Sequence, residues 1–218
     1  MLFRSGTGVG VVVAASRIRH PLDARTLARL AARYAGEGPG TVVGFGLSND
    51  ERRGMTSEFA HAFRIAARAG LASVPHAGEL LGADHVHVAL DHLRPDRLAH
   101  GVRSVEDASV LDRVVQEQVT LEVCPGSNVA LGVYDSLAEV PLPRLLEAGA
   151  RVALGADDPL LFGSRLAAQY ATMRAAHDLD DTALADLARG SIRASAAPEE
   201  SKSRWLRDVD AWSGTMPA

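Results

Sequence analysis

Side chains capable of metal binding and acid-base chemistry follow three apolar runs of this sequence. His76 and Glu79 come directly after one run, His100 closes a second, and Asp157 follows a third. Imidazole and carboxylate groups bind Zn²⁺, and a carboxylic acid also transfers protons. If the three runs are parallel strands, their carboxyl ends share one rim, which is the catalytic face of barrels and doubly wound sheets. The pattern predicts a metal-dependent hydrolase.

Other polar residues have plainer explanations. Asp157-Asp158-Pro159 also fits a helix cap, because aspartate before a proline at N1 is favourable by itself. His85 and His87 fall in a predicted helix, where residues two apart point about 200° away from each other and cannot share an ion. We expect a solvated helix face there. Cys124 has no histidine beside it in sequence, so we expect a packed thiol and not a nucleophile.

The elements that must position these side chains are strands alternating with helices. Apolar runs begin near residues 9, 41, 71, 97, 119 and 150, and a spacing of about 22 to 32 residues suits strand-helix units. Helical crossovers imply parallel strands with right-handed connections. We expect the first strand, Val9–Ala15, to be buried on both faces. A capping pattern at Ser104–Asp107 predicts a helix to about Gln116, and another helix is expected over Leu160–His177.

Length and composition favour a single α/β domain over residues 1–218, since no linker, low-complexity tract or charge block interrupts the pattern. A net charge of −4 gives no electrostatic case for nucleic acid or an anionic membrane. The single cysteine excludes an internal disulfide framework and suits a reducing cytoplasm. No apolar run approaches the roughly 20 residues that cross a bilayer. We therefore expect a cytoplasmic protein with no nucleic-acid or membrane partner.

Four segments, taken together, resemble the adenosine deaminase family in order and approximate spacing. They are His76-Ala77-Gly78-Glu79, Arg97-Leu98-Ala99-His100-Gly101, Leu121–Asn128 and Gly155-Ala156-Asp157-Asp158-Pro159. The resemblance covers nearly the whole chain and implies a (β/α)8 TIM barrel of the metallo-dependent hydrolase type. About six strand-helix units are present where such a barrel has eight, so we expect an incomplete barrel.

The resemblance also implies roles for the residues at the strand ends. Family members bind one zinc ion and hydrolyse the 6-amino group of an adenine ring, as in the conversion of adenosine to inosine and ammonia. In this sequence His76 and Asp157 would be zinc ligands, and Zn²⁺ makes hydroxide available near neutral pH. His100 would help to orient that hydroxide, and Glu79 would protonate ring N1. The implied substrate contacts are Asp158, which would hold N7, together with Asn49 and Gly78.

Two departures from the family pattern bear on activity and substrate. The family carries a His-x-His metal pair on its first barrel strand, and we expect that the N-terminal strands with this pair are missing before Val9. The family's Asp-Leu-Ala-Gly-Asp-Glu segment is here Gly46-Leu47-Ser48-Asn49-Asp50-Glu51, so a side chain replaces the glycine whose N–H approaches ring N3. The substrate is therefore open among adenosine, adenine and aminodeoxyfutalosine.

Two further hypotheses remain at this stage. One is an inactive truncated remnant that serves only as a binding or oligomerising module, because two protein ligands are too few for a tight catalytic zinc site. The other is a metal hydrolase of the same barrel superfamily that acts on another amide or amidine, although the spacing of Glu79 argues against it. The sequence leaves the oligomeric state open.

Overall fold

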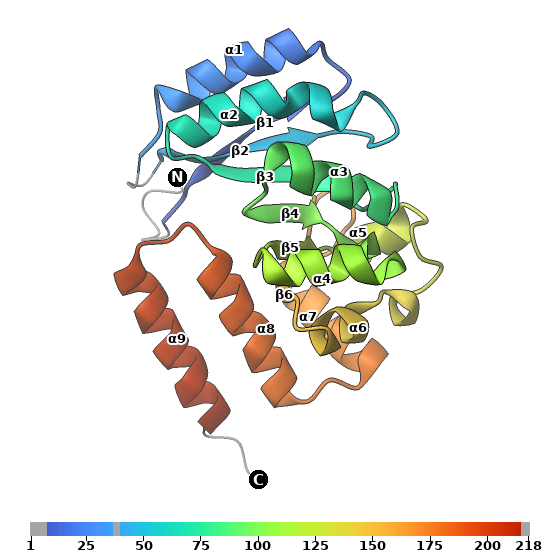
Figure 1. Cartoon of the computed structure of the whole chain (residues 1–218). Coiled ribbons are helices and arrows are strands. Elements are labelled where there is room, and N and C mark those ends of the chain that lie inside the picture. The colour runs from blue at the N-terminus through green and yellow to red at the C-terminus, as the bar shows by residue number, and fades with distance from the viewer. Residues whose placement is uncertain (1–7, 37–39, 215–218) are drawn as a thin grey trace. The chain divides into compact units, whose positions relative to one another are not determined.

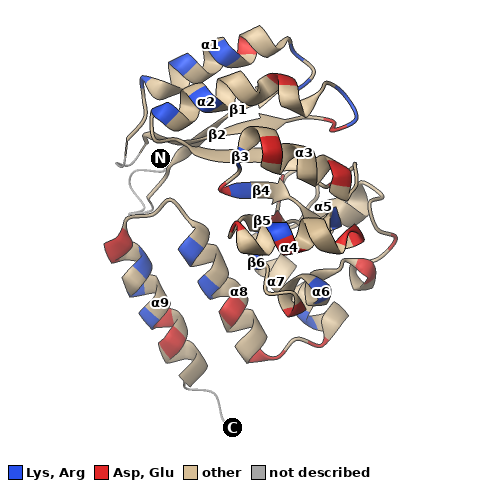
Figure 2. Ribbon diagram, viewed as in Figure 1, with Lys and Arg blue, Asp and Glu red and all other residues tan. Residues whose placement is uncertain are grey.

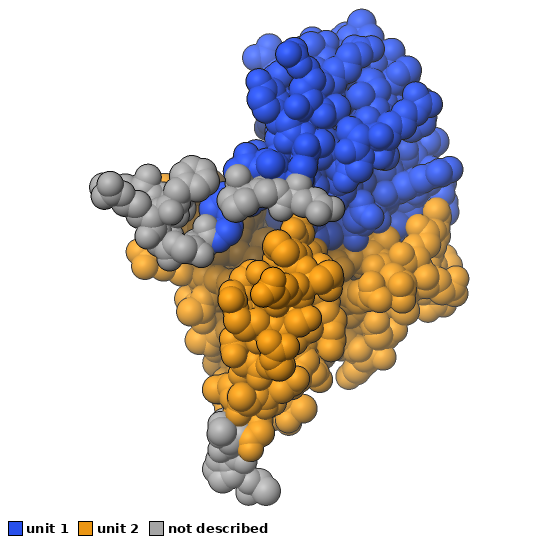
Figure 3. Space-filling model, turned by 90° about the vertical axis from the view of Figure 1, so that its left-hand side faces the viewer, with its two compact units in different colours: residues 1–106 blue, residues 107–218 orange. Residues whose placement is uncertain are grey.

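A computed structural model describes residues 8–36 and 40–214. The chain divides into two compact units, residues 1–106 and 107–218, which Figure 3 shows in different colours. Strands and helices alternate through both units, as the sequence predicts. The first unit contains β1 (Val11–Ser16), α1 (Pro21–Ala32), β2 (Val42–Ser48), the 3₁₀ helix η2 (Thr56–Phe59), α2 (Ala60–Arg68), β3 (Ala72–Ala77), α3 (Ala83–Leu93), β4 (Arg97–His100) and the 3₁₀ helix η3 (Val102–Glu106).

The four strands of the first unit are parallel and lie in the order in which they occur in the chain (Figure 1). Their register brings the strand ends together at one edge. Ser16 of β1 is opposite Ser48 of β2, and Ala77 of β3 is opposite His100 of β4. Because parallel strands share one direction, the residues that follow β2, β3 and β4 all emerge at that edge.

The core of the first unit forms between the strands and helices α1 and α2, which pack against each other. Small residues on α1 allow the helices and strands to approach closely, and Ala24, Ala28 and Ala31 are almost fully buried. Phe45 of β2 meets Phe63 of α2 edge to face, with ring centroids 5.2 Å apart. An aromatic pair of this kind adds about 0.5–1.5 kcal/mol beyond its buried area.

The expectation that the first strand is buried on both faces is wrong. Val11 and Val12 are 40% and 38% exposed, whereas Ala15 is only 2% exposed. β1 is the first strand in the sheet order and pairs with β2 among the described residues. A β-branched run predicts a strand from its backbone preference, but burial depends on the neighbours that cover it.

Among the residues that the structure describes, the second unit carries two parallel strands and most of the helical residues. Leu121 of β5 is opposite Val152 of β6, and the pairing continues to Val123 and Leu154. Basic and acidic residues are interspersed along α8 and α9 (Figure 2). The elements are α4 (Ala108–Gln116), β5 (Thr120–Val123), α5 (Pro125–Ala130), the 3₁₀ helix η4 (Leu137–Glu139), α6 (Leu142–Glu147), β6 (Arg151–Leu154), α7 (Leu166–His177), α8 (Asp181–Ala194) and α9 (Glu199–Gly214).

Two helix starts in the second unit differ from the sequence-based expectation. The helix expected from Leu160 begins at Leu166, because Leu160 is 97% exposed and the preceding residues form a turn. The helix expected from the Ser104 pattern begins at Ala108. Its N-cap is Asp107, whose Oδ1 accepts a hydrogen bond from the Ser109 amide at 2.8 Å. In the described residues, no helix has the length and apolarity needed to cross a membrane.

Candidate active site

His76 lies near the carboxyl end of β3 with its ring orientation fixed by a backbone carbonyl. Its Nδ1 is 2.8 Å from the carbonyl oxygen of Leu47 on β2. Because a carbonyl only accepts, Nδ1 carries the proton, and in the neutral ring Nε2 presents its lone pair. Metal-binding histidines are commonly oriented in this way. The half-buried His76 ring therefore fits the predicted role of a metal ligand through Nε2.

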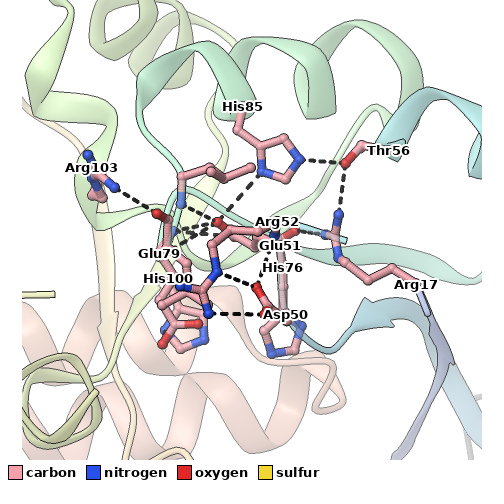
Figure 4. Close-up of polar contacts among 12 residues, drawn as sticks. Arg17, Asp50, Glu51, Arg52, Thr56, His76, Glu79, His85, His100 and Arg103 are labelled. Carbon is pink, nitrogen blue, oxygen red and sulfur yellow. Dashed lines mark hydrogen bonds and ion pairs between the residues drawn. The ribbon is translucent and has the colours of Figure 1, made fainter. Parts of the chain in front are cut away.

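Glu79 and His100 form a buried pair beside His76 (Figure 4). Glu79 Oε1 lies 3.4 Å from His100 Nδ1, and the two residues are 7% and 2% exposed. The rings of His76 and His100 lie 5.1 Å apart between centroids. The first unit therefore brings His100 of β4 together with His76 and Glu79, which lie at the end of β3, and the sequence analysis assigned all three to the site.

Sharp left-handed turns of the backbone follow the strands at this edge. Three residues of the predicted site in the first unit have positive φ angles: Asn49 at 79°, Gly78 at 75° and His100 at 73°. A Cβ on Gly78 would stand 2.4 Å from Val86 Cγ2, so only glycine fits there without displacement. Residues other than glycine held at positive φ cost free energy and cluster at functional sites.

Asn49 occupies the position at which the family pattern has glycine. Its left-handed backbone explains why asparagine can stand there, since asparagine tolerates this conformation better than other residues with a Cβ. The side-chain Nδ2 donates a hydrogen bond to Ser16 Oγ at 2.9 Å, and the residue is exposed. The substrate contact predicted for Asn49 stays a prediction.

The backbone at Asn49 predicts an ordered response to substitution. Asn49→Ala is expected to lower the free energy of unfolding by about 1–2 kcal/mol, the cost of a left-handed residue with a Cβ. Asn49→Gly removes the same exposed hydrogen bond, but glycine adopts a positive φ without steric cost. Its free energy of unfolding is therefore expected to fall by less than about 0.5 kcal/mol. Urea unfolding of both variants measures the difference. Equal losses in both would contradict the conformational explanation.

In the second unit, Asp157 follows β6 with φ at 55° and is itself hydrogen-bonded. Ser127 Oγ, from α5, donates to Asp157 Oδ2 at 2.7 Å. This leaves Asp157 Oδ1 for another partner such as a cation. Asp158 uses Oδ1 to accept the amide hydrogens of Leu160 and Leu161, both at 3.0 Å, so this oxygen holds the turn after β6. The predicted roles of both aspartates toward metal and substrate stay predictions.

Cys124 is a packed thiol, as predicted. It is 7% exposed, and its Sγ donates weakly to the Glu122 carbonyl at 3.5 Å. A Cβ added at Gly155 would stand 2.8 Å from this sulfur, so the absence of a side chain at residue 155 is what makes room for the thiol.

The sequence analysis missed a buried polar cluster behind Glu79. The expected solvated helix face is correct for His87, whose side chain is 52% exposed, and wrong for His85, whose side chain is 12% exposed. His85 Nε2 lies 2.7 Å from Thr56 Oγ1, and Nδ1 lies 3.6 Å from Glu51 Oε2. Helical periodicity does not reveal the loop and 3₁₀ helix that cover the first turn of α3. The only sequence signal was the acidic pair Asp50-Glu51 in a loop after a buried strand.

Comparison with known proteins supports the resemblance seen in the sequence. The sequence model of the adenosine deaminase family matches residues 3–212. A putative adenosine/adenine deaminase of Streptomyces coelicolor is 61% identical over 95% of this chain and 60% of its own length. An adenine deaminase of Mesorhizobium japonicum is 40% identical over 93% of this chain and 62% of its own length. The chain thus spans about three fifths of the curated relatives that it matches.

Solved structures agree with these relatives. Adenine deaminase from Arthrobacter aurescens superposes with a TM-score of 0.86 at 36% identity, over 94% of this chain and 61% of that chain. An amidohydrolase from Burkholderia ambifaria with bound zinc gives 0.87 at 21% identity, over 98% and 60%, and shows a similar fold. The fold is therefore that of a partial TIM barrel. The chain belongs to the adenosine deaminase family.

Proposed function

We propose that this chain carries the larger part of a zinc-dependent aminohydrolase that removes the 6-amino group of an adenine ring. The observation that carries the proposal is the buried Glu79–His100 pair beside the oriented ring of His76. This arrangement supplies an acid, a second proton-handling group and a metal-binding nitrogen at the ends of two neighbouring strands.

The donors present suit zinc. His76 offers an imidazole nitrogen whose ring is fixed by Leu47, and Asp157 offers the carboxylate oxygen not used by Ser127. Catalytic zinc sites take about three protein ligands, so at least one more ligand is needed beyond His76 and Asp157. When bound, the metal would supply Lewis-acid activation of the attacking water. Side chains of this chain would carry out the proton transfers of the reaction.

Glu79 is the acid that protonates the ring nitrogen next to the reacting carbon. Protonation at N1 removes electron density from the ring and makes C6 open to attack by water. The step requires a neutral Glu79 in the substrate complex. His100 contacts Glu79, and this contact supports the proposal that His100 handles the proton released by the attacking water. As water adds to C6, one of its protons passes through His100 to the amino group, the C6–N bond breaks, and ammonia leaves. The other proton of the water restores neutral Glu79 as the C6–O double bond forms.

The relatives favour free adenine at least as strongly as adenosine. Proteins named adenine deaminase reach 43% identity, and a structure with that name reaches 36%. In this chain the residue before Asp50 is Asn49, whose side chain is held by Ser16 beside the strand ends. We therefore propose adenine and adenosine as the two substrates to test first, with aminodeoxyfutalosine third.

Metal content and a substrate panel test the proposal. The purified chain, with and without added zinc, is assayed for bound metal, for ammonia and for loss of adenine absorbance. Adenine, adenosine, deoxyadenosine and aminodeoxyfutalosine are the substrates. With zinc in excess over the weak affinity of a site with two protein ligands, we expect the chain to bind zinc and to act on adenine or adenosine. Substoichiometric zinc after reconstitution, together with no ammonia from any substrate, would overturn the enzyme proposal for this chain and favour the inactive binding module.

A further inference from the structure

The segment that carries Glu79 is held from behind by the carboxylate of Glu51. This carboxylate is 2% exposed and lies between β2 and η2. Its oxygens accept hydrogen bonds from three consecutive backbone amides: Glu79 at 3.2 Å, Leu80 at 3.0 Å and Leu81 at 2.9 Å. Three successive N–H groups directed at one anion resemble the backbone concavities that bind phosphate. Here the anion belongs to the protein.

A series of side-chain contacts leads to Glu51 from Arg17, the residue that follows β1. Arg17 Nη1 donates to Thr56 Oγ1 at 2.9 Å, and Thr56 Oγ1 lies 2.7 Å from His85 Nε2 (Figure 4). Since Arg17 can only donate, the Thr56 hydroxyl is free to give its own proton to Nε2 of the neutral ring. The remaining ring proton then sits on Nδ1, which faces Glu51 Oε2 at 3.6 Å.

The electrostatics of this cluster favour an ionised Glu51. Burial raises the pKa of Glu51, but the neighbouring His85 ring and the hydrogen bonds from the Leu81 and Glu79 amides outweigh it, so the pKa lies below its usual range. Burial lowers the pKa of Arg17, and the Glu51 charge is the main opposing influence. The cation and the anion are thus both held inside the first unit, at 1% and 2% exposure.

Arg17 also reaches the strand that carries the predicted metal ligand. Its Nη2 donates to the backbone carbonyl of His76 at 2.6 Å. On the opposite side of the same segment, Arg103 Nη1 donates to the Leu80 carbonyl at 2.9 Å. The backbone from His76 to Leu81 is therefore held at its carbonyls by two arginines and at its amides by Glu51.

We propose that Glu51 is a positioning residue for the reaction. Glu51 fixes the position of Glu79 through hydrogen bonds from three backbone amides, and the contacts that run from Arg17 through Thr56 and His85 fix the position of Glu51. Charge-assisted hydrogen bonds are stronger than neutral ones, so an ionised Glu51 fixes the segment more tightly than an amide would. The inference rests on the proposed function for its catalytic consequence. The structural part of the proposal is that the hydrogen bonds to Glu51 hold the backbone of residues 79–81, and this part does not depend on activity.

The test compares Glu51→Gln with Glu58→Gln in the full 218-residue chain. Glu58 is exposed and lies in η2, so it is a matched control for the same chemical change. We expect amide hydrogen exchange at residues 79–81 to accelerate at least about tenfold in Glu51→Gln only. We also expect kcat to fall about tenfold or more with KM and zinc content unchanged. Unchanged exchange at residues 79–81 in Glu51→Gln would overturn the proposal.

Thr56 provides a second test that leaves the carboxylate in place. Thr56→Val removes the hydroxyl with little change in shape and is expected to speed exchange at residues 79–81 severalfold, while Thr56→Ser restores the native rate. If Glu51→Gln does not fold, the two Thr56 variants decide the question. Equal exchange rates at residues 79–81 in Thr56→Val and Thr56→Ser would refute the role of the contacts from Arg17 through Thr56 and His85 to Glu51. If the unsubstituted chain shows no deamination, the proposed function fails. The exchange measurements still decide whether Glu51 holds the backbone of residues 79–81.

Discussion

Glu79→Gln is expected to lower kcat for deamination by about 10²- to 10⁴-fold, the range that a positioned acid contributes. Glutamine has nearly the same shape and can keep the contact with His100 and the buried position of Glu79. It has no acidic proton to give to ring N1, so the ring stays a poor electrophile. Steady-state rates at saturating substrate measure the loss.

Zinc content provides the control for this variant. Glu79 is proposed as an acid and not as a ligand, so metal bound per chain is expected to equal that of the unsubstituted protein. Glu58→Gln, at an exposed position, is expected to retain full activity. A Glu79→Gln protein that keeps its rate would remove Glu79 from the chemistry, and one that loses its zinc would make Glu79 a ligand instead.

His76→Ala is expected to weaken zinc binding by more than the roughly 10- to 100-fold that loss of a residue supporting a ligand costs. The reason is the fixed ring of His76, whose Nδ1 proton is committed to the Leu47 carbonyl and whose Nε2 is left for the metal. Competition with a chelator of known affinity measures the change. The matched variant is His92→Ala, which removes an exposed imidazole in the last turn of α3.

The outcome for these two histidine variants separates two explanations of His76. If both variants bind zinc equally, the Leu47 contact of His76 is only part of the packing between β2 and β3. If His76→Ala alone loses zinc and also keeps its unfolding midpoint in urea, the ring acts as a ligand and contributes little to stability.

The alternation of strands and helices could be predicted from the sequence because each strand is a short apolar run with its own turn signals. The positions of His76, Glu79 and His100 followed from the same reasoning, since parallel strands release their following residues at one edge. Their roles came from the resemblance to a family and not from the pattern alone.

The buried cluster behind Glu79 could not be predicted by that reasoning. Glu51 and Arg17 are charged, and charged residues are rarely buried unless paired, so a single sequence favours the surface for both. Their burial depends on contacts 28 to 59 residues away in the chain. His85 was assigned to solvent for a different reason: helical periodicity does not show which loop covers the end of a helix.

The exposure of β1 has a similar explanation. Val11 and Val12 belong to an apolar β-branched run that reads as an interior strand, yet they remain more than a third exposed. Backbone preference is a property of the run itself, whereas burial is a property of the neighbours. The left-handed backbone at His100 was also invisible, because histidine carries no sequence signal for it.

The hydrogen bond from Arg17 to the His76 carbonyl links residues separated by 59 positions. Contacts of such long range form only after the intervening chain has been organised, and they slow folding for that reason. Three successive strands must therefore assemble before the backbone beside Glu79 acquires its final shape. A partly folded form in which β2, β3 and β4 have paired without β1 would show native secondary structure and still lack an ordered catalytic segment.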